Sequence, residues 1–256
     1  MSGSTRRWWH RTKNRERLAE SPEATPGSAI SGSETDIRKE RRMRRRRAVG
    51  VVLAAICLCV AMLLAIGAPR AQAFPTLQTG DLLFQTTKGR LALVIHAATH
   101  SKITHVGVVV MRGGVPWVLE ASGPVAMTRL RRFVDRGVGK RVVVKRLAKR
   151  LTAYQQKKLV KAGRRFLAVR YDGAFRWSDS RMYCSELVWK AYERGPGIRL
   201  VEPETMGDLY NSYNPIVTAF AARKYGKNLP VTESIVTPKR LFDSSMLVTI
   251  YDDTWF

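Results

Sequence analysis

Residues 183–187 read Tyr183-Cys184-Ser185-Glu186-Leu187 and place a cysteine at the start of Cys184–Arg194, a segment whose apolar residues recur at helical spacing. The other two cysteines, Cys57 and Cys59, lie in an apolar run near the N-terminus. Cys184 therefore has no partner for an intrachain disulfide within its own domain. Amide groups at a helix N-terminus stabilise a thiolate and lower the pKa of the thiol. The placement predicts a nucleophile, and the plainer alternative is a buried, inert thiol.

A base for this thiol has to come from the histidines, of which the chain holds four. His10 lies before the apolar run and is excluded. His96 and His100 have the spacing of a helical metal pair, but Ala97 stands where a zinc protease motif requires Glu, so we expect no metal site. His105 lies in an otherwise apolar strand, where a polar ring needs a partner. It is the candidate base, with a core histidine bonded to a backbone carbonyl as the alternative.

A carboxylate for His105 follows from the predicted hairpin, which pairs Ile103–Met111 with Val115–Ala121 around Arg112-Gly113-Gly114. With Arg112-Gly113 as the turn, His105 faces Glu120 directly. With Gly113-Gly114 as the turn, Glu120 becomes a diagonal neighbour on the same face of the sheet. Either register predicts that Glu120 orients the imidazole, and a surface-facing Glu120 is the alternative. Tyr183 is a candidate oxyanion donor or supporting residue beside the amide of Cys184.

The order of the expected elements defines the fold class. Strands and helices follow one another without regular alternation, which favours an α+β domain with an antiparallel sheet. Besides the hairpin and Cys184–Arg194, the patterns predict strands over Asp81–Gln85, Val142–Arg146 and Met246–Tyr251, and helices over Leu91–Thr99, Tyr154–Leu167 and Pro238–Phe242.

The N-terminal segment precedes this domain and has a different character. Residues 1–47 are polar and basic without apolar periodicity, so we expect them to be a disordered cytoplasmic leader. The uncharged residues 48–68 have the length of a bilayer span, and the basic cluster before them predicts that the domain lies outside the cytoplasm. The alternative is a cleaved signal peptide, read from Met43, with cleavage after Ala73 in the linker 69–78. The working domain is then 79–256, in the cell envelope or secreted.

The charge of the chain bears on its partners. The formal net charge is +25, and residues 129–165 contain fifteen Lys or Arg but one acidic residue, Asp135. Such a region favours an anionic cell-wall polymer or membrane surface, although a solvated surface is the plainer interpretation. Nucleic acid is not expected, because the predicted topology places the domain outside the cytoplasm. The sequence leaves the oligomeric state open.

Taken together, these motifs resemble the YiiX/YebB-like cysteine hydrolases, circularly permuted relatives of the NlpC-type papain-like amidases. The resemblance covers nearly all of residues 79–251. Its matching stretches are Thr79-Gly80-Asp81-Leu82-Leu83-Phe84, Thr104-His105-Val106-Gly107, Leu119-Glu120-Ala121, Tyr171-Asp172, Tyr183-Cys184-Ser185-Glu186-Leu187 and Thr237-Pro238. The order His, Glu, then Cys matters, because unpermuted papain-like enzymes place the cysteine first.

This resemblance implies a circularly permuted papain-like domain, with an antiparallel sheet or small barrel packed against helices. It also implies Cys184 as nucleophile, His105 as base and Glu120 as the orienting residue, without a cofactor or a metal. We expect a hydrolase that cleaves amide bonds, in cell-wall peptides, through an acyl-enzyme. The alternatives are a lipid acyltransferase or esterase of the same fold and a non-catalytic wall-binding module.

Overall fold

The computed structural model describes residues 33–67 and 73–253, which fall into two compact units, residues 1–70 and 71–256. The first unit contains the helix α1 (Ser33–Gly67), whose described side chains are all exposed. Disorder was therefore the wrong prediction for residues 33–47. Arg, Lys, Glu and Met are good helix formers, so this stretch is helical without a core to pack against.

Of the predicted membrane segment, residues 48–67 form the C-terminal part of α1, and residue 68 lies outside the described residues. Across the described residues, no helix combines the length and the apolar character needed to cross a membrane. The part of the predicted leader before residue 33 lies outside the described residues. Of the predicted cleavage site Ala71-Gln72-Ala73, only Ala73 is described.

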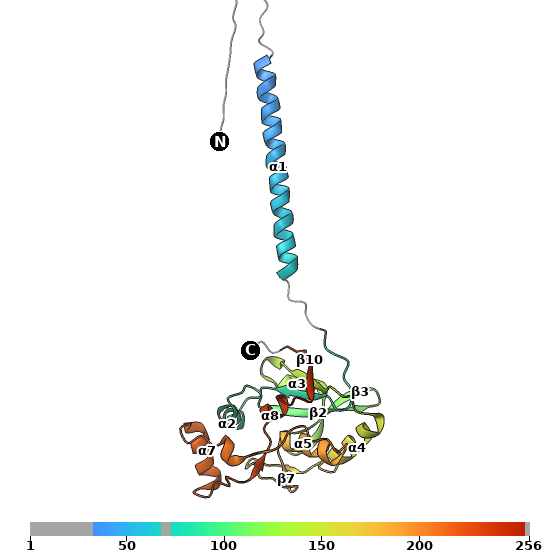
Figure 1. The fold of residues 1–256 in the computed structure, drawn as a ribbon, viewed down its shortest axis with the longest axis vertical. Coiled ribbons are helices and arrows are strands. Elements are labelled where there is room, and N and C mark those ends of the chain that lie inside the picture. Colours follow the sequence, from blue (N-terminus) through green and yellow to red (C-terminus); the bar gives the residue numbers. More distant parts are fainter. Residues whose placement is uncertain (1–32, 68–72, 254–256) are drawn as a thin grey trace, which may run out of the picture. The chain divides into compact units, whose positions relative to one another are not determined.

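The sheet of the second unit is antiparallel, as the sequence predicted (Figure 1). Of the two predicted forms, a sheet or a small barrel, the described residues adopt the open sheet. Within residues 73–253 its six strands follow the order β10-β5-β1-β2-β3-β4. They are β1 (Leu82–Gln85), β2 (His105–Arg112), β3 (Val115–Ala121), β4 (Val125–Arg129), β5 (Val143–Leu147) and β10 (Leu247–Asp252). Strand β4 was not predicted, because it follows β3 after a short turn and has little apolar alternation.

The hairpin β2–β3 takes the second of the two predicted registers. Arg112 pairs with Val115, so the turn is Gly113-Gly114, and both glycines have positive φ. Two residues of that conformation are what a tight hairpin turn requires, and glycine adopts it without a Cβ clash. Glu120 is accordingly a diagonal neighbour of His105, and the alternative register centred on Arg112-Gly113 is wrong.

Helices cover both faces of the sheet, with α3 on one side and α5 on the other (Figure 1). Leu82, Phe84 and Leu119 pack with α5, whereas Leu83 and Val118 pack with Phe133 of α3. The helices after α1 are α2 (Arg90–Thr99), α3 (Leu130–Arg136), α4 (Ala153–Arg164), α5 (Cys184–Arg194), α6 (Met206–Leu209), α7 (Pro215–Tyr225) and α8 (Pro238–Phe242), with a short 3-10 helix at Val138–Lys140. Two-stranded pairs join β6 (Arg170–Tyr171) to β7 (Arg181–Met182) and β8 (Glu204–Thr205) to β9 (Ser234–Ile235).

A third apolar cluster lies outside the two faces of the sheet. It is formed by Phe175, Tyr183, Met206 and Ile235, with side chains of α2 and α7 packed against them. The helix α7, which was not predicted, contacts α2 here. This cluster borders the start of α5 and therefore borders Cys184.

Candidate active site

The helix α5 begins at Cys184, which is only 2% exposed. Two hydrogen bonds fix this first turn against a neighbouring segment. The backbone N–H of Val236 donates to the hydroxyl of Tyr183 (3.2 Å), and the hydroxyl of Ser185 donates to the carbonyl of Val236 (2.7 Å). Of the two roles predicted for Tyr183, oxyanion donor or supporting residue, these contacts fit the supporting one. Its oxyanion role stays a prediction.

His105 lies at the start of β2 and connects the thiol to a carboxylate. Its Nε2 is 2.7 Å from Oε2 of Glu120, so the other ring nitrogen, Nδ1, is the one available to Cys184. The ring also packs against Phe133, with centroids 5.6 Å apart. All three of the predicted catalytic side chains are buried, and the fold brings them together in the order Cys184, His105, Glu120.

The electrostatics of this chain favour a thiolate and imidazolium pair. Burial by itself would raise the pKa of Cys184, but the charge and hydrogen bond of His105, together with the N–H of Val106, lower it overall. Burial by itself would lower the pKa of His105, but the contacts with Cys184 and Glu120 raise it to about 9. The thiol of Cys184 thus ionises more readily than a free thiol, and the thiolate is the form that attacks.

Glu120 is held as a carboxylate by two cations. Burial opposes its ionisation, but hydrogen bonds from His105 and Arg136 bring its pKa down to about 2. Arg136, the last residue of α3, donates from Nη2 to Oε1 of Glu120 and from Nη1 to the hydroxyl of Ser122 (3.1 Å). Arg136 was not predicted, because nothing in a sequence rich in arginine marks the one whose side chain turns inward.

Tyr171 is a second residue whose place the motifs alone did not explain. Burial raises the pKa of its hydroxyl well above the usual range, and the negative charges of Cys184 and Asp172 raise it further. The hydroxyl therefore keeps its proton close to the thiolate, where it can act as a hydrogen-bond donor.

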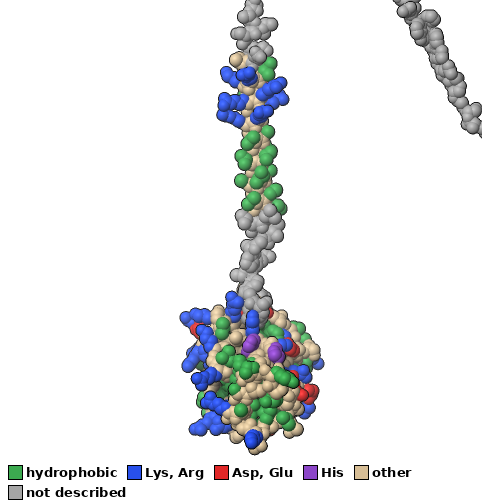
Figure 2. Space-filling view, turned by 90° about the vertical axis from the view of Figure 1, so that its left-hand side faces the viewer, with side chains coloured by type: hydrophobic (Ala, Val, Ile, Leu, Met, Phe, Trp, Pro, Cys, Tyr) green, Lys and Arg blue, Asp and Glu red, His purple; other side chains and the backbone are tan. Residues whose placement is uncertain are grey.

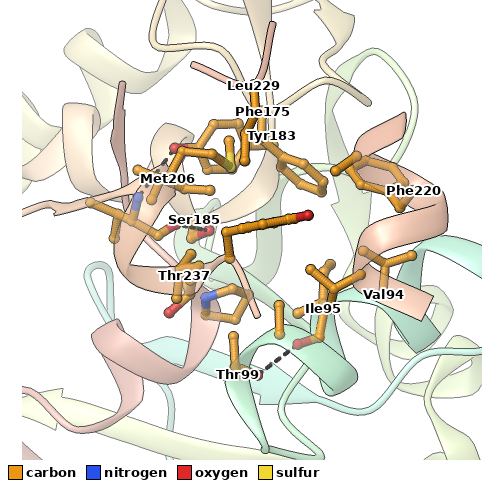
Figure 3. Close-up of a pocket in the computed structure, with 18 of the residues that line it drawn as sticks. Val94, Ile95, Thr99, Phe175, Tyr183, Ser185, Met206, Phe220, Leu229 and Thr237 are labelled. Carbon is orange, nitrogen blue, oxygen red and sulfur yellow. Dashed lines mark hydrogen bonds between the residues drawn. The ribbon is translucent and has the colours of Figure 1, made fainter. Parts of the chain in front are cut away.

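Two cavities flank the catalytic pair, and Ile95 of α2 lines both. One, which we call the apolar pocket, contains Cys184 and is lined by Val94, Ile95, Phe175, Met206, Phe220 and Val236 among others (Figure 3). The other, the histidine-side cavity, contains His105. It is lined by polar side chains, including Lys88, Ser122, Arg136 and Tyr171, and also by apolar side chains of α2. Within the described residues, no three His, Cys, Asp or Glu side chains come together as metal ligands would.

The thiol lies at the start of a helix, and the imidazole and the carboxylate lie on a hairpin that precedes it in the sequence. These groups define a cysteine hydrolase of the papain type in which the order of the catalytic residues is permuted. Comparison with known proteins agrees: residues 76–251 match the model of the permuted papain-like amidase enzymes, YaeF/YiiX, C92 family, and the chain belongs to that family. The fold and the enzyme class predicted from the sequence are thereby confirmed.

Two relatives from Escherichia coli illustrate the similarity. The chain is 39% identical to the uncharacterized protein YiiX of strain K12 over 173 residues, which cover 68% of this chain and 85% of that protein. It is also similar to the crystal structure of a protein described as metalloprotein YiiX, from strain O157:H7. That comparison gives a TM-score of 0.67 at 40% identity and covers 70% of this chain and 99% of the other.

Proposed function

We propose that this chain hydrolyses amide bonds through a covalent acyl-enzyme on Cys184. The observation that carries the proposal is the continuous contact from Cys184 through His105 to Glu120, with pKa shifts that favour the charged pair. A nucleophile, a base and an orienting carboxylate in contact are the groups that such catalysis requires.

In the proposed reaction Cys184 is the nucleophile, His105 transfers the protons and Glu120 stabilises the imidazolium. The thiolate of Cys184 attacks the carbonyl carbon, forming a C–S bond and placing negative charge on the oxygen, which the N–H groups at the start of α5 face. When the C–N bond breaks, its electron pair goes to nitrogen, which takes the proton of the His105 imidazolium. His105, now neutral, removes a proton from water, the water oxygen attacks the thioester, and Cys184 leaves as the thiolate. Glu120 stabilises the imidazolium in both steps.

We place this activity in the cell envelope. Support comes from the basic cluster that precedes the uncharged residues 48–68 in the sequence. The basic region 129–165 supports an anionic cell-wall polymer or membrane surface as partner. Cell-wall peptides are the substrate class that the sequence favours, and the apolar pocket beside Cys184 favours lipid amides or esters as the second candidate.

The proposal is tested by incubating the purified chain with wall fragments and, separately, with N-acyl lipids and phospholipid, and identifying the products by mass. Cys184→Ala is the matched control. We expect the native chain to hydrolyse an amide or ester bond in one of these substrate classes. The Cys184→Ala chain should give no such products. Cleavage that is equal in the Cys184→Ala chain would show that Cys184 is not the nucleophile.

A further inference from the structure

The end of helix α3 is fixed beside the start of β2, where His105 lies. The N–H of Val138, just after the helix, donates to the carbonyl of Thr86 (2.8 Å). Gly137 approaches the sheet so closely that a Cβ there would lie 2.8 Å from Oε1 of the buried Gln85. Gln85 in turn pairs with His105 in the register of β1 and β2. The last turn of α3 is thereby held next to the candidate base.

This helix presents two side chains to the hairpin, three residues apart and so on one face of the helix. Phe133 packs on the imidazole of His105, with ring centroids 5.6 Å apart. Arg136 donates to Oε1 of Glu120 and to the hydroxyl of Ser122 (3.1 Å). Its guanidinium also lies 5.9 Å from the centre of the Phe133 ring. One helix therefore contacts both the base and the carboxylate that orients it.

Arg136 and His105 divide the two oxygens of Glu120 between them. Oε1 accepts from Arg136, and Oε2 lies 2.7 Å from Nε2 of His105. With both oxygens engaged, the carboxylate is held in the orientation that faces the imidazole. Glu120 is only 1% exposed, so its charge depends on protein partners rather than on water. Lys and Arg side chains are widespread on the face of the second unit that Figure 2 shows, and it is this buried partner that distinguishes Arg136.

The charges of the four groups balance. A thiolate on Cys184, an imidazolium on His105 and a carboxylate on Glu120 sum to one negative charge, and all three residues are buried. Burying an uncompensated charge is costly, and Arg136 supplies the cation that makes the sum zero. Without it, the site would relieve the excess negative charge by holding a proton, so the thiol of Cys184 would ionise only at higher pH.

We infer that Arg136 is a positioning residue of the catalytic site: it holds Glu120 against His105 and balances the charge that lets Cys184 ionise. Arg136 acts through Glu120, and not on the substrate or the reacting atoms. The inference rests on the proposed role of Cys184 as nucleophile, and it extends the catalytic apparatus from the hairpin and α5 to α3.

Other titratable groups also face the site, but they do not replace Arg136. They include Lys88 before α2, Arg129 at the end of β4, Arg132 of α3, Tyr171 and Asp172 at β6, and Tyr183 before α5. The three cations are exposed, so water screens their charges. Burial raises the pKa of both tyrosines well above the usual range, so they stay neutral. Asp172 adds a negative charge, which increases the need for the buried contact of Arg136.

Chemical rescue tests this role, because Arg136 lines two cavities, of ≈ 320 Å³ and ≈ 470 Å³. Arg136→Ala leaves a space that a guanidinium ion can enter. The readout is alkylation of Cys184 by iodoacetamide across the pH range, followed on the peptide that contains residue 184. Guanidinium chloride is added well below denaturing concentrations. Urea, which has the same shape without the charge, and NaCl are the controls.

We expect Arg136→Ala to move the midpoint of the alkylation profile up by about half a pH unit to one unit, which slows alkylation on the acidic side roughly threefold to tenfold. Guanidinium should return the midpoint most of the way to its native position, and urea and NaCl should not. An unmoved midpoint in a folded Arg136→Ala chain, or a midpoint that urea restores equally well, would overturn the inference. A shift that guanidinium leaves in place would assign the effect to altered packing and also overturn it.

Two further variants guard against a folding defect in Arg136→Ala. Arg136→Gln keeps a donor without the charge, so its midpoint should move up as well. Arg136→Lys keeps the charge, so its midpoint should stay close to the native one. Arg132→Ala removes the same charge from an exposed position on α3 and should not move the midpoint. A native midpoint in Arg136→Gln, or an equal shift in Arg132→Ala, would contradict the role of Arg136.

The same measurements separate this inference from the proposed function. A Cys184 that reacts no faster than a model thiol in the native chain would contradict both. An activated Cys184 whose midpoint none of the Arg136 variants moves would overturn the inference alone. A midpoint that Arg136 controls, together with no cleavage of wall fragments or lipids, would support the inference and contradict the hydrolase.

Discussion

His105 lies between two anionic groups, and this position determines the pH range in which the site can work. Attack requires the thiolate, which forms above the lowered pKa of Cys184. Departure of the amine requires the imidazolium, which is lost as the pH rises through about 9, the raised pKa of His105. Activity should therefore have an acid limb below the usual thiol range and an alkaline limb near pH 9.

Glu120→Gln tests the role of the carboxylate. Since Glu120 raises the pKa of His105, its neutral analogue should move the alkaline limb to lower pH and reduce turnover by roughly a hundredfold to ten-thousandfold. The pH profile of kcat/KM gives the position of the alkaline limb, and the melting temperature shows whether the variant is folded. Glu202→Gln, at an exposed position, is the control. An active, folded Glu120→Gln chain with an unmoved limb would show that another group orients His105.

At the scale of elements, the start of α5 is fixed from within by a buried ion pair. Lys190 is 1% exposed, and its Nζ lies 2.7 Å from Glu186 and 2.9 Å from Asp179 while donating to the carbonyl of Ser178. Glu186 also accepts the N–H of Ser178 (3.2 Å). The pair thus connects the first turns of α5 to the loop that precedes them.

Lys190→Met should destabilise the fold by about 3–5 kcal/mol, because it leaves the carboxylate of Glu186 buried without its cation. The free energy of unfolding in urea measures the loss. Lys239→Met is the matched control, since Lys239 pairs with Asp243 at the same i,i+4 spacing but at the surface. It should cost less than about 1 kcal/mol. Equal costs for the two variants would contradict a structural role for the buried pair.

Local patterns predicted most of the elements around the site, but not those that tertiary contacts define. The extent of α5 follows from its apolar spacing, and the place of Glu120 on the face of His105 follows from the two-residue period of a strand. Arg136 could not be selected, because its contact with Glu120 forms only when α3 packs on the sheet. The start of helix α7 is marked in the sequence by an Asn214 N-cap followed by Pro215, a pattern typical of a helix N-terminus.

At the scale of the whole molecule, the basic region 129–165 is not one uniform surface. Arg136 pairs with Glu120, Arg146 pairs with Asp81, and Lys145 donates to the carbonyl of Phe242, so these three cations are already engaged within the domain. Among the exposed cations of this region, Lys157, Lys161 and Arg164 of α4 and the next residue, Arg165, line one surface depression. If the region binds an anionic partner, this group of four is a candidate contact surface.

Reversing charges on α4 tests this surface. Lys157→Glu, Lys161→Glu and Arg164→Glu together should weaken binding to phosphatidylglycerol vesicles by on the order of a hundredfold or more. The same number of reversals on or just after α7, at Arg223, Lys224 and Lys227, is the control of equal net charge. Cosedimentation with the vesicles at two salt concentrations measures the binding of both variants. Equal losses would indicate that net charge, rather than α4, governs binding.

The predicted topology is tested by fusing a reporter that is active only outside the cytoplasm after Phe256. The basic residues before residue 48 should retain the N-terminus inside and send the domain outward, so the fusion should be active. Replacing the arginines at 44–47 with glutamine should lower that activity. An inactive fusion, together with activity of a second reporter that works only in the cytoplasm and is fused at the same position, would contradict the assignment to the envelope.

The central claim is that Cys184 is a thiolate activated by His105, and the pH dependence of its alkylation by iodoacetamide tests this most directly. Peptide mapping follows residue 184 apart from Cys57 and Cys59. We expect alkylation at pH 6 to be much faster than that of a model thiol, whose pKa is about 8.5. The advantage should disappear in His105→Ala. Alkylation of Cys184 that is no faster than the model thiol, with the same pH profile in the native and His105→Ala chains, would contradict the claim.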